Sequence, residues 1–228
     1  MQDLENNKAA IYHFTDESKK RPEVYKKQLR ALEAFAVENG LEVTDVFCDM
    51  SLRKVDGVEF KRFMSNCENY NALVTKDFYH ISKNTGKCLG TLKELRSMGL
   101  TVYSIENGCF RWTEADFDKP LKVATYFCYY GTENENRDTV SLKNDVFSLF
   151  VEKKTNWTLV DMYQDEALLQ INGEQPNLQE LIANSDKYDL LLVHNMNDIH
   201  RRTTAFCKVR EALKLDIYSL QEGFLAYR

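Results

Sequence analysis

The chain contains the stretch NYNALVTKDFYHISK at Asn69 to Lys83 and a similar stretch, KYDLLLVHNMNDIHR, at Lys187 to Arg201. In each, a short apolar run suited to a buried strand is followed by polar turn residues. Three more pairs of similar stretches occur, and the four pairs have the same order in the two halves. They are AAIYHF (9–14) with VATYFC (123–128), TDVFCD (44–49) with VDMYQD (160–165), and VYSIENG (102–108) with IYSLQEG (217–223). Four collinear matches predict that the chain is a tandem duplication.

Apolar residues at helical spacing lie between the strand-like runs. In the first half they form three groups: Leu29, Leu32, Phe35 and Ala36; Phe60, Phe63, Met64 and Cys67; and Leu89, Leu92 and Leu95. Strands separated by helices are typical of a mostly parallel sheet with helices on both faces. We therefore predict an α/β protein of two tandem three-layer domains, residues 1–119 and 120–228.

Composition limits the class of protein. The 228 residues are 43% hydrophobic and 29% charged, and no run approaches the roughly 20 apolar residues that a membrane span needs. The first residues are polar and unlike a secretion signal. The six cysteines contain no CxxC pair, which favours free thiols over disulfides or zinc. These features predict a soluble, cytoplasmic protein without a membrane partner.

The charge balance does not favour strong DNA binding. The net charge is -5. Lys and Arg number 18 against 19 Asp and Glu up to Lys119, and 12 against 16 beyond it. Because DNA-binding proteins are usually basic, any DNA contact is expected to be local or weak.

The first half resembles the catalytic domain of serine recombinases, the resolvases and invertases. Tyr12 stands at the tyrosine of the family's first strand, and Asp49 matches the aspartate that ends the second. The third and fourth landmarks are matched by Lys76, Asp77, Phe78, His80 and Lys83, and by Ser104, Ile105 and Gly108. In the second half only Tyr126, Asp165, Arg201 and Gly223 follow the pattern.

The resemblance implies a reaction in which a serine hydroxyl attacks a DNA phosphate while arginines neutralise the phosphoryl oxygens. The nucleophile position holds Asp16 in the first half and Tyr130 in the second. The arginine positions hold Phe14, His80 and Lys83 in the first half, and Cys128, Asp198 and Arg201 in the second, while the loop arginine falls near Gly57 and Gln175. A shift of one or two residues would bring Thr15 or Ser18 to the nucleophile position.

These replacements lead to the expectation that neither half cuts DNA, because losing a nucleophile and most of its arginines removes groups that act as a unit. We predict a non-enzymatic member of the family, linked to recombination by descent. Its expected role is to regulate or bind other proteins, either an active recombinase or a second copy of itself. No cofactor is expected.

Two alternatives remain open. Asp16, Asp49 and Asp77 follow neighbouring strands and could hold Mg²⁺ for a hydrolase. A weak DNA-binding protein could instead use Lys83, Lys87, Arg201 and Arg202. For two other groups the plainer interpretation is favoured. Surface roles are expected for His194 and His200 rather than metal ligation with Asp198, and Cys128 is expected to be a core thiol rather than a nucleophile.

Overall fold

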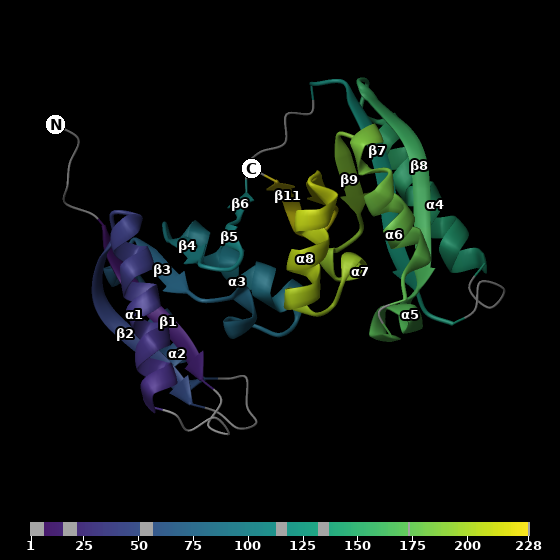
Figure 1. The fold of residues 1–228 in the computed structure, drawn as a ribbon. Helices are drawn as coiled ribbons and strands as arrows, with labels where there is room; N and C mark the ends of the chain where they lie inside the picture. The colour runs from purple at the N-terminus through teal and green to yellow at the C-terminus, as the bar shows by residue number, and fades with distance from the viewer. Residues whose placement is uncertain are drawn as a thin grey trace. The chain divides into compact units, whose positions relative to one another are not determined.

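The computed structural model describes residues 7–15, 22–50, 57–112, 118–131, 137–172 and 174–227. Contacts between residues divide the chain into two compact units, Met1–Phe110 and Arg111–Arg228. The purple-to-teal part of Figure 1 is unit 1, and the green-to-yellow part belongs to unit 2. Each unit has its own sheet.

Unit 1 alternates strands and helices. Its elements are β1 (Lys8–Thr15), α1 (Pro22–Glu38), β2 (Glu42–Met50), α2 (Val58–Met64), η2 (Cys67–Asn69), β3 (Ala72–Thr75), η3 (Phe78–His80), α3 (Thr85–Ser97), β4 (Thr101–Ser104) and β5 (Gly108–Cys109). The sheet order is β2-β1-β3-β4-β5, and only β5 is antiparallel to its neighbour. The turn into β5 needs Gly108, whose φ of 68° is unfavourable for residues with a side chain.

Strand β1 lies between β2 and β3 in the sheet of unit 1, and its alternating residues face two different layers. Ala9 and Ile11 are fully buried against Leu32 and Ala36 of α1, and Figure 1 shows this helix crossing β1 and β2. Tyr12 points the other way, and its ring centroid lies 4.8 Å from that of Phe60 in α2. The sheet is therefore covered on both faces, as expected for a parallel sheet.

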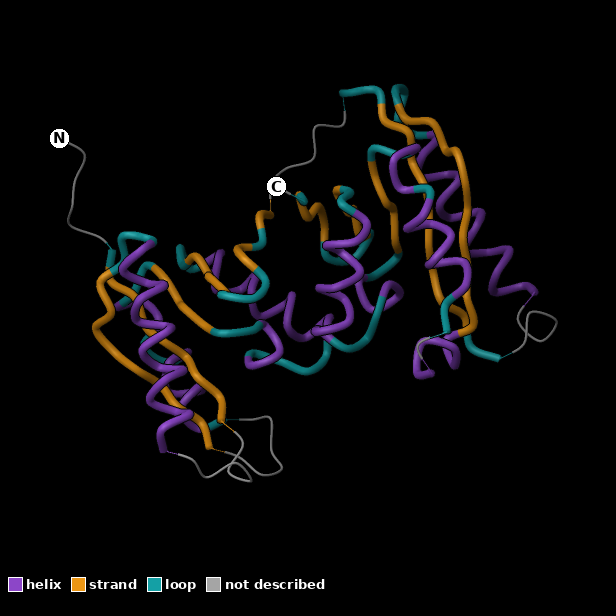
Figure 2. Tube along the Cα trace, viewed as in Figure 1, coloured by secondary structure: helices purple, strands orange, loops and turns teal. Residues whose placement is uncertain are grey.

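Unit 2 begins with a short strand and then follows the same alternation (Figure 2). Its elements are β6 (Arg111–Trp112), β7 (Leu121–Tyr129), α4 (Arg137–Glu152), β8 (Trp157–Glu166), α5 (Ala167–Asn172), α6 (Pro176–Ala183), η4 (Ser185–Lys187), β9 (Leu190–Val193), α7 (Met196–Ile199), α8 (Thr203–Leu213), β10 (Asp216–Ser219) and β11 (Gly223–Ala226). The order is β6-β11-β10-β9-β7-β8, with β6 and β11 antiparallel to their neighbours.

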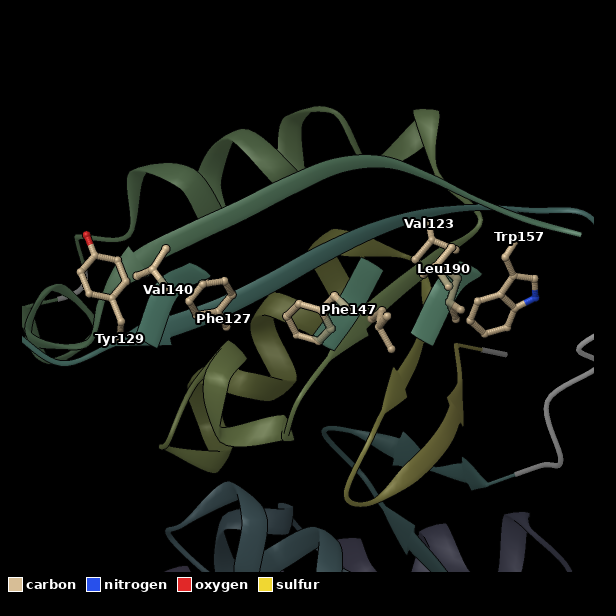
Figure 3. Packing of buried hydrophobic residues seen from close by; sticks show 9 residues of the cluster. Val123, Phe127, Tyr129, Val140, Phe147, Trp157 and Leu190 are labelled. Atoms are coloured by element: carbon tan, nitrogen blue, oxygen red, sulfur yellow. The ribbon is translucent and has the colours of Figure 1, made fainter. Parts of the chain in front are cut away.

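One hydrophobic cluster of unit 2 lies between β7 and α4. Figure 3 shows Phe127 of β7 facing Phe147 of α4, and their ring centroids are 6.1 Å apart. Val123 and Leu190 extend this apolar layer towards Trp157 at the start of β8. Burying these large side chains is the main driving force for folding of this unit.

The two sheets share an irregularity in the edge strand. In unit 1, Ala9 pairs with Val43 and Ala10 with Asp45, so Thr44 is an extra residue in β2. In unit 2, Val123 pairs with Leu159 and Ala124 with Asp161, which leaves Val160 extra in β8. Each is a β-bulge, a feature that reverses the facing of the residues that follow it.

The predicted fold class, α/β with mostly parallel sheets flanked by helices, is confirmed. Within the described part of the chain, no helix is both long and apolar enough to cross a membrane.

Candidate functional site

The carboxyl ends of β1 and β2 in unit 1 are joined by the carboxylate of Asp49. Its Oδ2 accepts hydrogen bonds from the Tyr12 hydroxyl at 3.1 Å and from the Phe60 backbone N–H at 2.9 Å. Its Oδ1 accepts from the Glu59 N–H at 3.0 Å. Asp49 therefore satisfies two backbone donors at the start of α2 that have no partner within the helix.

Tyr12 is the buried end of this arrangement. Burial raises the pKa of its phenol, and the nearby Asp49 carboxylate raises it further. The hydroxyl is consequently a neutral donor at any physiological pH. The sequence resemblance located Tyr12 and Asp49 but did not indicate that they hold the helix.

Gly57 leaves the space in which Asp49 lies. A Cβ atom at this position would be 1.7 Å from Asp49 Oδ2, far closer than any non-bonded contact. The backbone of Gly57 has φ -57° and ψ 132°, which any residue can adopt. Glycine is required here for space and not for backbone conformation.

Unit 2 repeats the carboxylate arrangement with Asp165. Its Oδ2 accepts from the Tyr126 hydroxyl at 3.0 Å and from Leu178 N–H at 2.9 Å, and its Oδ1 accepts from Asn177 N–H at 3.1 Å. Where unit 1 has Gly57, unit 2 has the buried side chain of Gln175. Its Nε2 donates to the Tyr126 hydroxyl at 2.8 Å and to the Ile199 carbonyl at 3.3 Å.

Two further predicted positions of unit 2, Cys128 of β7 and Asp198 of α7, are buried. Cys128 Sγ lies 3.3 Å from the Tyr126 hydroxyl and donates to the Asp198 carbonyl at 3.3 Å. Burial raises the pKa of Cys128 to about 11. The thiol is therefore protonated, as expected of a core residue and not of a nucleophile. Burial also raises the pKa of Asp198, whose Oδ2 accepts from Asn195 N–H.

Tyr130, Arg201 and Arg202 lie at the surface of unit 2. Tyr130 is 55% exposed, and the Arg201 guanidinium carbon lies 4.6 Å from its ring centroid. Arg202 is the residue that precedes α8. Its backbone N–H donates to His200 Nδ1 at 3.0 Å.

A groove of about 340 Å³ lies beside the start of α2 and α3 in unit 1. Three exposed lysines line it: Lys61 of α2, Lys83 before α3 and Lys87 in the first turn of α3. The other lining residues are Gly57, Phe60, Ile81, Ser82, Asn84 and Thr91, so none of the lining residues is acidic. Three ammonium groups without a carboxylate among the lining residues favour an anionic ligand.

The loop at this groove is ordered by its own side chains. Asn84 caps α3, with its Oδ1 accepting from Lys87 N–H at 3.0 Å, and Ser82 Oγ accepts from Asn84 N–H at 3.2 Å. Lys83 Nζ lies 5.4 Å from the Tyr79 ring centroid. Sequence reasoning found Lys83 and Lys87 but missed Lys61, which only the folded chain brings to them.

His80 and Phe14, which stand at two arginine positions of the family, belong to an aromatic cluster. The His80 ring lies 5.5 Å from the ring of His13 and 6.0 Å from that of Phe14. Burial, with smaller contributions from His13 and Lys76, lowers the pKa of His80 to about 4. A neutral imidazole packed in this way does not replace a cationic arginine.

The buried histidines predict a pH-dependent stability. An unfolded histidine titrates near 6.5, whereas folded His80 titrates near 4, so folding at low pH must release a proton. The contribution of His80 to the free energy of unfolding is complete above about pH 6.5 and decreases as the pH falls towards about 4. Between about pH 7.5 and about pH 5, the free energy of unfolding measured with urea should decrease less for His80→Phe than for the unmodified chain. Equal losses would show that His80 is not the group responsible.

Asp49 and Asp77, two of the three aspartates of the metal hypothesis, are not brought together as ligands. Both oxygens of Asp49 are used by Tyr12 and α2, and Asp77 caps η3 by accepting from Tyr79 N–H at 2.8 Å. Asp16 lies outside the described residues, as does Ser18. In the described part of the chain, no group of three or more His, Cys, Asp or Glu side chains is placed to hold a metal ion. Thr15 ends β1, half-buried, and is not among the residues lining the groove.

Fold and groove together define unit 1 as an α/β domain with a cationic groove at the carboxyl edge of a mostly parallel sheet. Comparison with protein families makes the assignment specific, because residues 15–125 match the family "Resolvase, N terminal domain". The predicted resemblance of the first half of the chain to the resolvase family is thereby confirmed.

Solved structures with a partial likeness include three from recombinases. The N-terminal catalytic domain of TP901-1 integrase is 19% identical with a TM-score of 0.39, and the match covers 44% of this chain and 78% of that one. The C-terminal catalytic domain of ISC1926 TnpA, an IS607-like serine recombinase, is 15% identical with a TM-score of 0.38, and the match covers 43% of this chain and 70% of that one. A resolvase family site-specific recombinase from Streptococcus pneumoniae is 16% identical with a TM-score of 0.37, and the match covers 64% of this chain and 89% of that one. Among curated proteins, none matches this chain.

The family match corrects one prediction. The expectation that this protein is not an enzyme is wrong, because residues 15–125 match a family of recombinase catalytic domains. The expectation rested on comparing residue types at single positions. Such a comparison does not establish a loss of activity, since it assumes that the end of β1 is aligned without a shift.

Proposed function

We propose that the protein acts in site-specific DNA recombination and that the groove of unit 1 binds a phosphate of the DNA backbone. The groove carries this proposal, because Lys61, Lys83 and Lys87 line it without an acidic residue in a resolvase-family domain. The start of α3 adds the partial positive charge of a helix N-terminus. With a net charge of -5 on the whole chain, binding depends on this local cluster.

DNA binding by variants of the groove tests the proposal. We expect a short duplex DNA to bind the full chain at low salt, with an affinity that falls as salt rises. Changing Lys61, Lys83 and Lys87 together to Gln should weaken binding about tenfold or more and reduce the slope of log affinity against log salt by about 2. Fluorescence anisotropy at several salt concentrations measures both quantities.

A matched variant separates the groove from overall charge. Changing Lys26, Lys27 and Arg30 of α1 to Gln removes the same charge from unit 1 outside the groove, and should leave the slope nearly unchanged. Equal effects of the two triple variants, or no binding of DNA to the unmodified chain at low salt, would contradict the proposal.

A role as a protein-interaction module is the second candidate, with an active recombinase or a second copy of the chain as partner. Exposed apolar residues of α4 favour it. Such a role is compatible with DNA binding, because α4 belongs to unit 2 and the groove to unit 1.

The two units are also proposed to be copies of one ancestral domain. Several shared details support this: the same order of the paired strands, a bulge at the same point of the edge strand, and a tyrosine that donates to a carboxylate which caps the next helix. A second pair agrees, since Tyr70 donates to Asp45 at 2.9 Å and Tyr188 to Asp161 at 2.5 Å. Unrelated α/β domains would share the layers but not these side-chain contacts.

A further inference from the structure

Helix α4 exposes three apolar side chains on one face. Leu142 is 64% exposed, Val146 39% and Leu149 56%. Their spacing of four and three residues places them in a row, which we name the α4 stripe. The buried residues Val140, Phe147 and Val151 occupy the opposite face of the helix. The stripe is therefore not part of the core of unit 2.

The fold does not require apolar residues at these positions. Helix α1 occupies the corresponding place in unit 1, where Leu32 and Ala36 are buried as Phe147 and Val151 are in unit 2. Counting from these anchors, Leu142, Val146 and Leu149 correspond to Lys27, Ala31 and Ala34, which are exposed. One helix carries small or charged residues where the other carries large apolar ones. A contiguous exposed apolar row of this kind is a feature of interaction surfaces.

An acidic row runs alongside the α4 stripe. Asp138, Asp145 and Glu152 are spaced seven residues apart, lie on the adjacent side of the helix, and are all exposed. Among the described residues, none of these carboxylates is in an ion pair. An apolar row with charges along its flank is the pattern by which one helix selects another.

We propose that the α4 stripe binds an amphipathic helix of a partner protein whose apolar face is flanked by lysine or arginine. The acidic row selects the basic flank, because opposite charges beside a helix seam are favourable and like charges are not. A second copy of α4 packed antiparallel would bring two acidic rows together, so self-association in that arrangement is disfavoured. The proposal stands apart from DNA binding by unit 1 and names the partner chemistry of the interaction module.

Binding of two synthetic peptides to the full chain tests the proposal. Both are helical peptides with leucines at i, i+4 and i+7. One has lysines along the flank of the leucine row, and the other has glutamates. By fluorescence anisotropy, the lysine-flanked peptide should bind at least about tenfold more tightly. Leu142→Gln with Leu149→Gln should weaken its binding by about tenfold or more, whereas Val37→Gln, which removes an exposed valine of α1, should have no effect.

A charge exchange distinguishes selection from general stickiness. Asp138→Lys with Asp145→Lys changes only exposed positions and should reverse the preference in favour of the glutamate-flanked peptide. Equal binding of both peptides, no binding of either, or an unchanged preference after the exchange would overturn the proposal. So would a dimer in sedimentation that the Leu142→Gln, Leu149→Gln variant abolishes, because the occupant of the stripe would then be a second copy. A failure of DNA binding would leave these results unaffected.

Discussion

Asp49→Ala should destabilise unit 1 by about 3 kcal/mol. The substitution leaves the buried Tyr12 hydroxyl without its acceptor and removes the cap from two backbone N–H groups of α2. An unsatisfied buried polar group costs more than the hydrogen bond itself contributes, because the group has also lost its contact with water. Urea unfolding followed by circular dichroism measures the change.

Two further variants make this expectation specific. Asp49→Asn keeps the shape but loses the charge and one acceptor oxygen, so its effect should be about half as large. Asp45→Ala, on the same strand, removes an exposed carboxylate that accepts from Tyr70, and should cost about 1 kcal/mol or less. If Asp45→Ala were as damaging as Asp49→Ala, the cap on α2 would not be the cause.

Gly57→Ala should cost about 2–3 kcal/mol, because the new methyl group overlaps the Asp49 carboxylate. The overlap also predicts how the two positions interact. In a chain that already carries Asp49→Ala the carboxylate is gone, and Gly57→Ala should then be nearly neutral. A double-mutant cycle measured by urea unfolding gives this coupling directly.

Gly90→Ala is the matched control for the same chemical change. Gly90 lies within α3, and nothing lies within 4 Å of its added Cβ. Because alanine favours the helix, this variant should be more stable by about 0.5–1 kcal/mol. If Gly57→Ala and Asp49→Ala changed the free energy of unfolding additively, the overlap of the new methyl group with the Asp49 carboxylate would be contradicted.

The alternation of strands and helices could be predicted from the sequence because both elements leave a local trace. The run at Ala9 to Phe14 is apolar without interruption, as a strand buried on both faces requires, and the row from Leu29 to Ala36 has the period of a helix. Collinear matches between the halves added the expectation of two similar units. These signals depend on spacing along the chain and not on the details of loops.

The site was predictable only where side chains lie near one another in sequence. Lys83 and Lys87 were identified together, whereas Lys61 joins them only because residues of α2 and α3 line the same groove. Asp16, Asp49 and Asp77 were grouped because each follows a strand. In the structure Asp49 and Asp77 cap separate helices instead. A sequence shows that a carboxylate ends a strand, but not which backbone N–H groups it meets.

His80 illustrates a related difficulty. The resemblance placed His80 only at a position where the family has an arginine, and in the structure its ring packs against His13 and Phe14. The burial that lowers its pKa comes from elements distant in sequence. The residues next to His80 in the sequence indicate neither its neutral state nor its packing.

The bulge at Thr44 decides which layer of unit 1 the Asp49 carboxylate faces. Val43, just before it, packs with α1, and in a regular strand every second residue after Val43, including Asp49, would face the same way. The bulge accommodates Thr44 as an extra residue, so Asp49 faces Tyr12 and α2 instead. Because the residues around Thr44 already pair as they would without it, deleting Thr44 should make the pairing of β1 with β2 regular and leave Asp49 on the same face. Unit 1 should therefore tolerate this deletion, and unit 2 should tolerate deletion of Val160 for the same reason.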